Sequence, residues 1–172
     1  MLHTSTVSTP LGDMLAMASA RGLCLLEFVD TRDLPRSIAQ VQQARGSTQR
    51  AQEGEALLER TRQQLHEYFA GQRQHFDVPL DWVGTDFQQR VWQVLLTIPF
   101  GQTRSYAQQA AALGQANAVR AVAGANGQNK ISILVPCHRV LGSDGGLTGY
   151  SGGLQRKQFL LALEAGQKPI YV

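Results

Sequence analysis

Cysteines and long apolar runs are what this 172-residue sequence has least of. Its two cysteines, Cys24 and Cys137, are too few for a disulfide-stapled scaffold. No apolar run approaches the roughly 18 to 20 residues that a membrane-spanning helix needs, so we expect no membrane partner. The apolar stretch Met14–Ala20 is not preceded by the basic residues of a signal peptide. The sequence therefore predicts a globular, cytoplasmic protein.

Acidic residues are scarce on one side of Gly84. The whole chain carries 16 Lys and Arg against 13 Asp and Glu, a formal net charge of +3. Residues 1–84 hold eight basic and ten acidic residues, a net of −2, whereas residues 85–172 hold eight basic and three acidic residues, a net of +5. One basic half is typical of a chain that meets an anionic partner on that side, with nucleic acid the first candidate. A chance imbalance of a few charges is the alternative.

The change of charge coincides with a change of pattern, which predicts two domains, 1–84 and 85–172. Short apolar stretches between Thr4 and Val29 alternate with turn residues and predict strands, the last of them ending at Val29. Helical spacing predicts a helix over Glu55–Ala70. The polar segment 30–53 indicates a surface excursion with at most a short helix, and residues 71–84 a linker. We expect an α/β (α+β) fold whose N-terminal sheet-and-helix domain is a scaffold.

The second half is predicted to be mostly helical. Thr85 with Gln88, and Ser105 with Gln108, have the spacing of capping boxes that open two helices. A third helix is expected from a cap at Asn117 to about Asn126. The second and third helices are short and flank a tight turn, which matches helix-turn-helix proportions. Many helical hairpins with a glycine turn have nothing to do with DNA, so this pattern alone is weak.

One face of the predicted third helix consists of small residues and an arginine. Arg120, Gly124 and Gly127 fall on that face, while Val122 falls nearer the other. Such a face can approach another surface closely. Alternatively, the small residues pack against a neighbouring helix and Arg120 is only solvated.

The segment that carries chemistry follows an apolar run, Ile131–Val135, which predicts a buried strand. Pro136 then leads into Cys137, His138 and Arg139. A nearby positive charge or base lowers a thiol pKa from about 8.5 and produces the nucleophilic thiolate. Neighbours on a strand point to opposite faces, so Cys137 and His138 cooperate only if Pro136 turns the backbone. A small structural cysteine is the alternative, and the commoner one.

A glycine-rich stretch follows, with six glycines among residues 141–153. It lacks the spacing and the Lys-Ser or Lys-Thr of a phosphate-binding loop. Tyr150 and Ser151, held among glycines, are placed to wall a pocket for an aromatic ring, although a flexible hairpin has the same composition. A helix is expected from Leu154 to Ala165, ended by Gly166.

Taken together, these segments resemble the O6-alkylguanine-DNA alkyltransferase family. The motifs that carry the resemblance are Pro136–Val140, Tyr150–Gly153, a helix ending near Glu164, Gly101–Tyr106 and Arg120–Val122. The resemblance runs from about residue 87 to residue 164 and implies DNA repair by direct damage reversal. One alkyl group would move irreversibly from O6-alkylguanine in duplex DNA to Cys137, with O4-alkylthymine a second candidate substrate. It implies a monomer near the bacterial nucleoid, with no cofactor and no metal.

The resemblance assigns five residues to the chemistry. Cys137 accepts the alkyl group. His138 deprotonates the Cys137 thiol through a water, and Glu164 orients the imidazole of His138. Asn129 braces the turn around the cysteine, and Tyr106 supplies a proton or donor at N3 of the departing guanine. The thioether product has no good leaving group, so each protein would react once.

The resemblance also implies how the damaged base is reached. O6 points into the duplex, so the nucleotide must rotate out of the stack. The helix-turn-helix would lie in the minor groove, with Arg120 filling the vacated space. Tyr106, Gln115 and Ser143 would contact the DNA as well, and the substrate-base pocket would be formed by Val140, Tyr150 and Ser151.

Some positions depart from the family pattern. Lys130 stands where many members have proline, which leaves the local turn less rigid, and Phe159 stands where tryptophan is common. A zinc site can be imagined from Cys24 and the histidines at 3, 66 and 75, but their spacing is irregular and scattered surface histidines are the better interpretation.

Two other function classes compete. A thiol hydrolase with a Cys-His dyad would need an oxyanion hole and leaves the helix-turn-helix and Tyr106 unexplained. A non-catalytic damage-binding relative would lack the nucleophile, and the presence of Cys137 argues against it.

Overall fold

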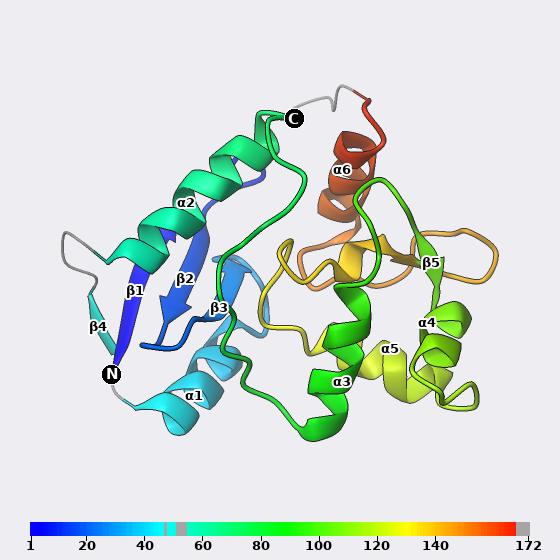
Figure 1. Cartoon of the computed structure of the whole chain (residues 1–172), viewed down its shortest axis with the longest axis horizontal. Coiled ribbons are helices and arrows are strands. Elements are labelled where there is room, and N and C mark those ends of the chain that lie inside the picture. The colour runs from blue at the N-terminus through cyan, green and yellow to red at the C-terminus, as the bar shows by residue number, and fades with distance from the viewer. Residues whose placement is uncertain (47, 51–54, 168–172) are drawn as a thin grey trace. The chain divides into compact units, whose positions relative to one another are not determined.

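The structure is a computed structural model, and it describes residues 1–46, 48–50 and 55–167. The chain divides into two compact units, Met1–Val83 and Gly84–Val172 (Figure 1). Within the described residues no helix is both long enough and apolar enough to cross a membrane.

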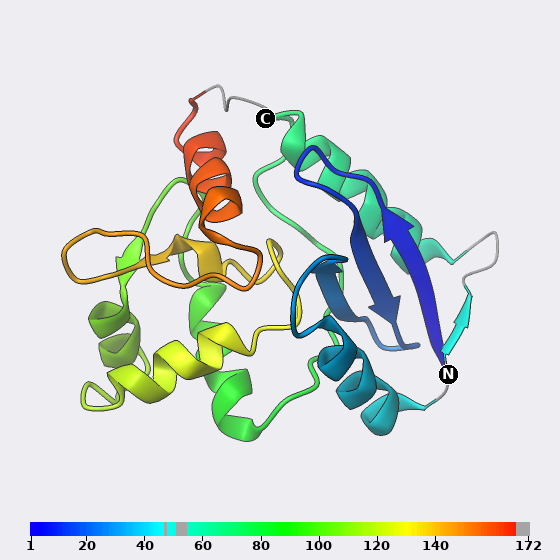
Figure 2. The same cartoon turned by 180° about the vertical axis from the view of Figure 1, so that it is seen from behind.

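The first unit is built on a four-stranded sheet with the strand order β3-β2-β1-β4. β1 (Leu2–Val7), β2 (Met14–Ala18) and β3 (Leu23–Phe28) pair antiparallel in succession, which confirms the strands predicted in this region. β4 (Thr48–Arg50) joins the edge parallel to β1. All six residues of β3 are buried. Helix α2 lies along one face of the sheet in both views (Figures 1 and 2).

Two helices complete this unit. α2 (Ala56–Phe69) occupies the segment where a helix was predicted. α1 (Leu34–Arg45) corrects the expectation of at most a short helix over 30–53, because it runs for 12 residues. Its proline lies in the first turn, where a missing N–H breaks no helical hydrogen bond. Only Leu34 and Val41 of this helix are buried, packed in the core with residues of β1 to β3, so its apolar signal in the sequence is weak.

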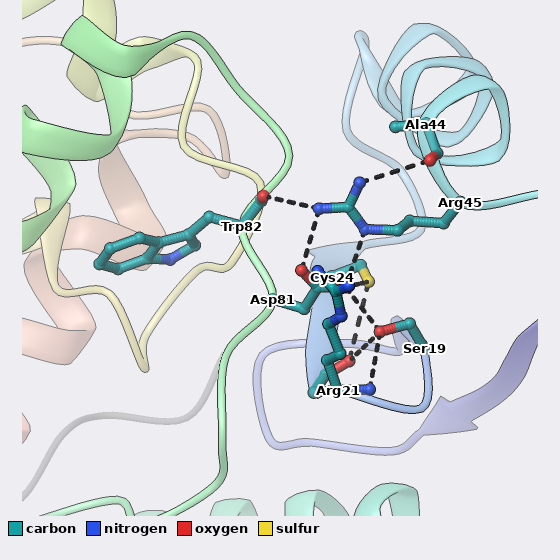
Figure 3. Close-up of polar contacts among 8 residues, drawn as sticks. Ser19, Arg21, Cys24, Ala44, Arg45, Asp81 and Trp82 are labelled. Atoms are coloured by element: carbon teal, nitrogen blue, oxygen red, sulfur yellow. Dashed lines mark hydrogen bonds and ion pairs between the residues drawn. The ribbon is translucent and has the colours of Figure 1, made fainter.

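Residues 71–83 do more than link two units, because Asp81 is a buried junction within the first one (Figure 3). Its carboxylate accepts hydrogen bonds from Ser19 Oγ at 2.6 Å and from Arg45 Nε and Nη2 at 2.8 and 2.9 Å. The bonds from Arg45 hold the pKa of Asp81 below its usual 3.8. Burial raises the pKa of the neighbouring Cys24 thiol, so this cysteine is a core residue. No described cluster of three or more His, Cys, Asp or Glu could hold a metal ion.

The second unit is mostly helical, as predicted. Its elements are α3 (Asp86–Leu95), β5 (Arg104–Ser105), α4 (Tyr106–Ala112), α5 (Val119–Gly127), the 3-10 turn η1 (Cys137–Arg139), β6 (Val140–Leu141) and α6 (Leu154–Glu164). Both capping boxes form, with Thr85 Oγ1 accepting from Gln88 N at 3.1 Å and Ser105 Oγ from Gln108 N at 3.0 Å. The predicted cap at Asn117 is wrong, because α5 starts after Ala118 and has no side-chain cap.

The predicted strand over Ile131–Val135 is also wrong. The segment is buried, but it curls into a turn in which Val135 N donates to Ile131 O at 3.1 Å and Ile133 has a positive φ of 72°. A short apolar run indicates that a segment is buried but not which backbone conformation it adopts, so the sequence could not distinguish a strand from a turn. The curl is held by Asn129, whose Oδ1 accepts from Ile131 N at 3.0 Å.

Candidate active site

Cys137 lies at the start of the single 3-10 turn η1, directly after Pro136. The turn replaces the strand geometry that would have sent neighbouring side chains to opposite faces. Asn129 Nδ2 donates to Val135 O at 2.9 Å and to Cys137 Sγ at 3.3 Å. Asn129 Oδ1 also accepts from Ile131 N. Asn129 therefore connects the apolar curl of residues 131–135 to the thiol.

The two residues after the cysteine, His138 and Arg139, form a buried charged network with Glu164. His138, with no exposed surface, shares a hydrogen bond of 2.8 Å between Nε2 and Glu164 Oε2. Arg139 donates from Nε to Glu164 Oε1 at 2.8 Å and from Nη2 to Oε2 at 3.0 Å. Its third nitrogen, Nη1, donates to Ile98 O at 2.7 Å, just beyond the end of α3. The carboxylate therefore accepts from both neighbours at once.

The network fixes the protonation of its members. Burial raises the pKa of Glu164, but hydrogen bonds from His138 and Arg139 outweigh it and leave the pKa at about 2. Burial is the largest influence on His138 and lowers its pKa below 6.5. A neutral imidazole facing an ionised carboxylate carries its proton on Nε2, which makes Nδ1 an acceptor. That Nδ1 is buried and has no hydrogen-bond partner among the described residues.

Lys157 is a site residue that the sequence analysis missed. Its side chain has no exposed surface, and Nζ donates to Val140 O and Thr148 O at 2.7 Å and to Gly149 O at 3.4 Å. Burial lowers its pKa, whereas the nearby Cys137 raises it. A signal was present, because Lys157 falls on the same helical face as Glu164, seven residues later.

The residues expected to form the base pocket lie in and beside the glycine-rich loop that Lys157 contacts at Thr148 and Gly149. Val140 is fully buried in β6, which pairs parallel with β5, while Tyr150 is half-buried and Ser151 is exposed. Tyr106 follows β5 at the start of α4, and its hydroxyl accepts from Thr148 Oγ1 at 3.3 Å. The β5–β6 pair thus brings Tyr106 to the loop that Lys157 anchors.

α5 presents the face expected from its sequence. Arg120, Gly124 and Gly127 are exposed, whereas Ala125 and Asn126 are buried. A Cβ atom added at either glycine would have no neighbour within 4 Å, so the face is open. The small residues therefore do not pack against another described helix.

Comparison with known families accounts for both units. Residues 2–82 match the model of the 6-O-methylguanine DNA methyltransferase ribonuclease-like domain, and residues 86–166 match that of the 6-O-methylguanine DNA methyltransferase DNA-binding domain. The chain belongs to this methyltransferase family. Cys137, the network of His138, Arg139 and Glu164, and the exposed glycine face of α5 all lie within the residues that match the DNA-binding domain of the family.

Individual methyltransferases support the assignment over the whole chain. The methylated-DNA–protein-cysteine methyltransferase of Mycobacterium leprae is 43% identical over 167 residues, covering 97% of this chain and 94% of the relative. That of Mycobacterium tuberculosis is 59% identical over 106 residues, and this match covers 62% of this chain and 64% of the relative, less than two thirds of its length.

Solved structures agree with the family. The Mycobacterium tuberculosis O6-methylguanine methyltransferase has a TM-score of 0.80 at 43% identity and covers 98% of this chain and 96% of its own. The Mycobacterium tuberculosis OGT in complex with DNA has a TM-score of 0.82 at 42% identity, with coverages of 97% and 95%.

The two departures from the family pattern have structural explanations. Lys130 is buried, and its Nζ lies 5.7 Å from the centre of the Trp92 ring, a cation–π contact. Phe159 is buried in α6. The turn that lacks proline is braced by Asn129, and Lys130 itself contacts the buried Trp92.

Of the residues expected to be functional, the structure brings Asn129 to Cys137 through a hydrogen bond and His138 to Glu164 through another. Cys137 and His138 are neighbours in the turn η1. Tyr106 contacts Thr148 in the glycine-rich loop. The other six lie outside these contacts. Val140 is in β6, and Tyr150, Ser151 and Ser143 are in the glycine-rich loop. Arg120 is on α5, and Gln115 follows α4.

Proposed function

We propose that this chain repairs duplex DNA by taking the methyl or larger alkyl group from O6 of a damaged guanine onto Cys137. The observation that carries the proposal is the buried His138, next to Cys137 in the turn η1, whose Nε2 is bonded to Glu164 at 2.8 Å and whose buried Nδ1 has no hydrogen-bond partner among the described residues. This is the arrangement of a base next to a nucleophile, set in a DNA-binding domain. O4-alkylthymine is the second candidate substrate.

The transfer is a single displacement. His138 Nδ1 accepts the proton of the Cys137 thiol through a water, and the thiolate sulfur attacks the alkyl carbon. The new S–C bond forms as the C–O6 bond breaks, and the electron pair of the broken bond stays on the guanine. The Tyr106 phenol donates to N3 of the departing base. Because a thioether neither leaves readily nor offers an acyl centre to water, the protein reacts once and needs no cofactor.

The DNA is proposed to bind through its minor groove against α5. Small residues at Gly124 and Gly127 permit the close approach, and Arg120 occupies the space left by the flipped nucleotide. Gln115 and Ser143 contact the backbone, and Val140, Tyr150 and Ser151 surround the extruded base. Few phosphates are neutralised, so binding is modest and salt dependent. We infer a monomer that works in the cytoplasm, on the nucleoid.

The two domains divide the work in this proposal. Residues 85–172, with a net charge of +5, supply the DNA contacts and the acceptor, and residues 1–84, with a net charge of −2, act as scaffold. The charge asymmetry in the sequence then has a physical reason, because only the basic domain meets phosphate.

The test is a stoichiometric reaction with a duplex oligonucleotide that contains one O6-methylguanine. Intact-protein mass spectrometry is expected to show one added methyl group, and peptide mapping is expected to place it on Cys137. Cys137→Ser should bind the duplex without accepting the methyl group, whereas Cys24→Ser should react like the parent protein. An unmodified parent protein at stoichiometric lesion would refute the proposal, and many turnovers on an ester or peptide substrate would favour a thiol hydrolase.

A further inference from the structure

Arg139 bonds both carboxylate oxygens of Glu164. The residue is 7% exposed; two nitrogens of its guanidinium donate to the carboxylate and the third donates to the carbonyl of Ile98. Glu164 in turn holds His138 through Oε2. The arginine is therefore fixed from two elements and touches the imidazole only through the carboxylate.

The charges around His138 determine whether its imidazole is protonated. The charged groups that act on it are Glu164 and Lys157 from α6 and Arg139 from η1. The segment after α3 contributes the Ile98 carbonyl, which accepts from Arg139. Without Arg139, the imidazole would sit beside an unneutralised buried carboxylate, which favours an imidazolium.

We propose that Arg139 is a positioning residue for the alkyl transfer: by neutralising Glu164 in a two-pronged ion pair, it keeps His138 uncharged and its Nδ1 open to the proton of Cys137. This inference rests on the proposed function and deepens it. An imidazolium has protons on both nitrogens and cannot accept the thiol proton. The carboxylate alone would orient the ring, but its unneutralised charge would also stabilise the imidazolium form.

The direction of the pH effect follows from this role. Burial lowers the pKa of His138, and the positive charge of Arg139 lowers it further, while Glu164 raises it. Removing Arg139 therefore raises the pKa at which His138 becomes charged. Transfer slows below that pKa, so the acidic limb of the rate profile moves to higher pH and the rates converge again at alkaline pH.

The experiment compares the parent protein with Arg139→Met and Arg139→Lys in single-turnover transfer from a saturating O6-methylguanine duplex between about pH 5.5 and 9. Arg139→Met is expected to shift the acidic midpoint upward by about one unit or more, which is a tenfold lower rate on the acidic limb. Arg139→Lys, which keeps the charge but not the fork, should shift the midpoint less. Arg90→Met removes an exposed arginine of α3 and is the matched control, with no shift expected.

A purely structural arginine would give a different result, namely a rate reduced by the same factor at every pH with an unchanged midpoint, and that outcome overturns the proposal. A second readout does not depend on activity. Nitrogen NMR of the four histidines in the parent protein should show His138 neutral with its proton on Nε2 at pH 7. An imidazolium there also overturns the proposal, even if Arg139→Met fails to fold. A parent protein that takes up no methyl group but shows neutral His138 would instead refute only the proposed function.

Discussion

Replacing the paired amides of Gln109 and Asn126 should separate DNA docking from chemistry. The two side chains lie between α4 and α5, exposed by only 2% and 7%, and bond reciprocally at 2.8 and 2.7 Å. Two reciprocal bonds between buried side chains favour one relative position of the two helices. Trp92 adds a third tie by donating from Nε1 to Ala125 O at 2.9 Å. We therefore expect the pair to set the pose of α5, and with it that of Arg120.

The magnitude follows from what each variant leaves behind. Asn126→Ala strands the Gln109 amide in the interior, and an unpaired buried polar group costs about 1–3 kcal/mol, to which a cavity adds. The double variant Gln109→Leu/Asn126→Leu removes both partners and keeps the volume, so its free energy of unfolding should stay within about 1 kcal/mol of the parent. A double-mutant cycle should show a coupling energy of roughly 0.5–3 kcal/mol.

The assay measures two transfer rates for each variant. One uses duplex DNA with an O6-methylguanine, which requires α5 to be placed against the DNA, and the other uses a free O6-alkylguanine base, which does not. The double leucine variant should react with the free base at the parent rate and with the duplex several-fold more slowly, because its stability is kept while the register is lost. Exchanging the amides, Gln109→Asn with Asn126→Gln, should restore part of the duplex rate.

The reasoning would be refuted by an unchanged ratio of duplex to free-base rates in a folded double leucine variant. The pair would then contribute to stability alone. Equal losses on both substrates would point to a disturbance of the cysteine turn and would refute it as well.

Three further predictions concern the rest of the chain. Lys157→Met removes a buried cation near Cys137 and three ties to the pocket loop, so alkylation of Cys137 by iodoacetamide at pH 7 should slow, as measured by peptide mass spectrometry. Asp81 has a folded-state pKa below its ordinary 3.8, so its stabilisation is complete above about pH 4 and is lost as the pH falls through the folded-state value. The urea midpoint of the parent should therefore drop in acid, and Arg45→Met should lose the part of this pH dependence that comes from Asp81, while the part that comes from Glu164 remains. Gly124→Ala on the exposed face of α5 should raise the free energy of unfolding by about 0.5–1 kcal/mol, yet reduce transfer from duplex DNA; an unchanged duplex rate would contradict close approach of this face.

Features that depend on neighbouring residues were predictable from the sequence. The capping boxes at Thr85 and Ser105 formed as expected, because a hydroxyl and a glutamine three residues later contain the whole motif. The cap at Asn117 failed by one residue, since the chain enters α5 through Ala118 without a side-chain bond. Where a signal was ambiguous, as in the polar helix α1 and the apolar curl before Pro136, tertiary packing decided the outcome.

In the candidate site, too, features set by neighbouring residues were predictable and features set by distant residues were not. Its nucleophile, base and carboxylate could be named from a short motif and a family resemblance. Arg139 stood in that motif, but its role could not be deduced, because it depends on Glu164, 25 residues away, and on a backbone carbonyl at residue 98. Lys157 bonds only to carbonyl groups, which every residue has, so no side-chain pattern marks its partners.

Because Lys157 bonds only to backbone carbonyls, the side chains of the glycine-rich loop do not take part in holding it. The anchors at positions 140, 148 and 149 are main-chain oxygens, so side chains between 142 and 147 can change without removing a single bond to the lysine. Libraries confined to Ser143 and Leu147, which leave the glycines and the Asp144 turn in place, should yield folded proteins in which the loop surface varies while its anchors stay fixed. Under the proposed function, these two positions are the place to alter which alkyl groups are accepted.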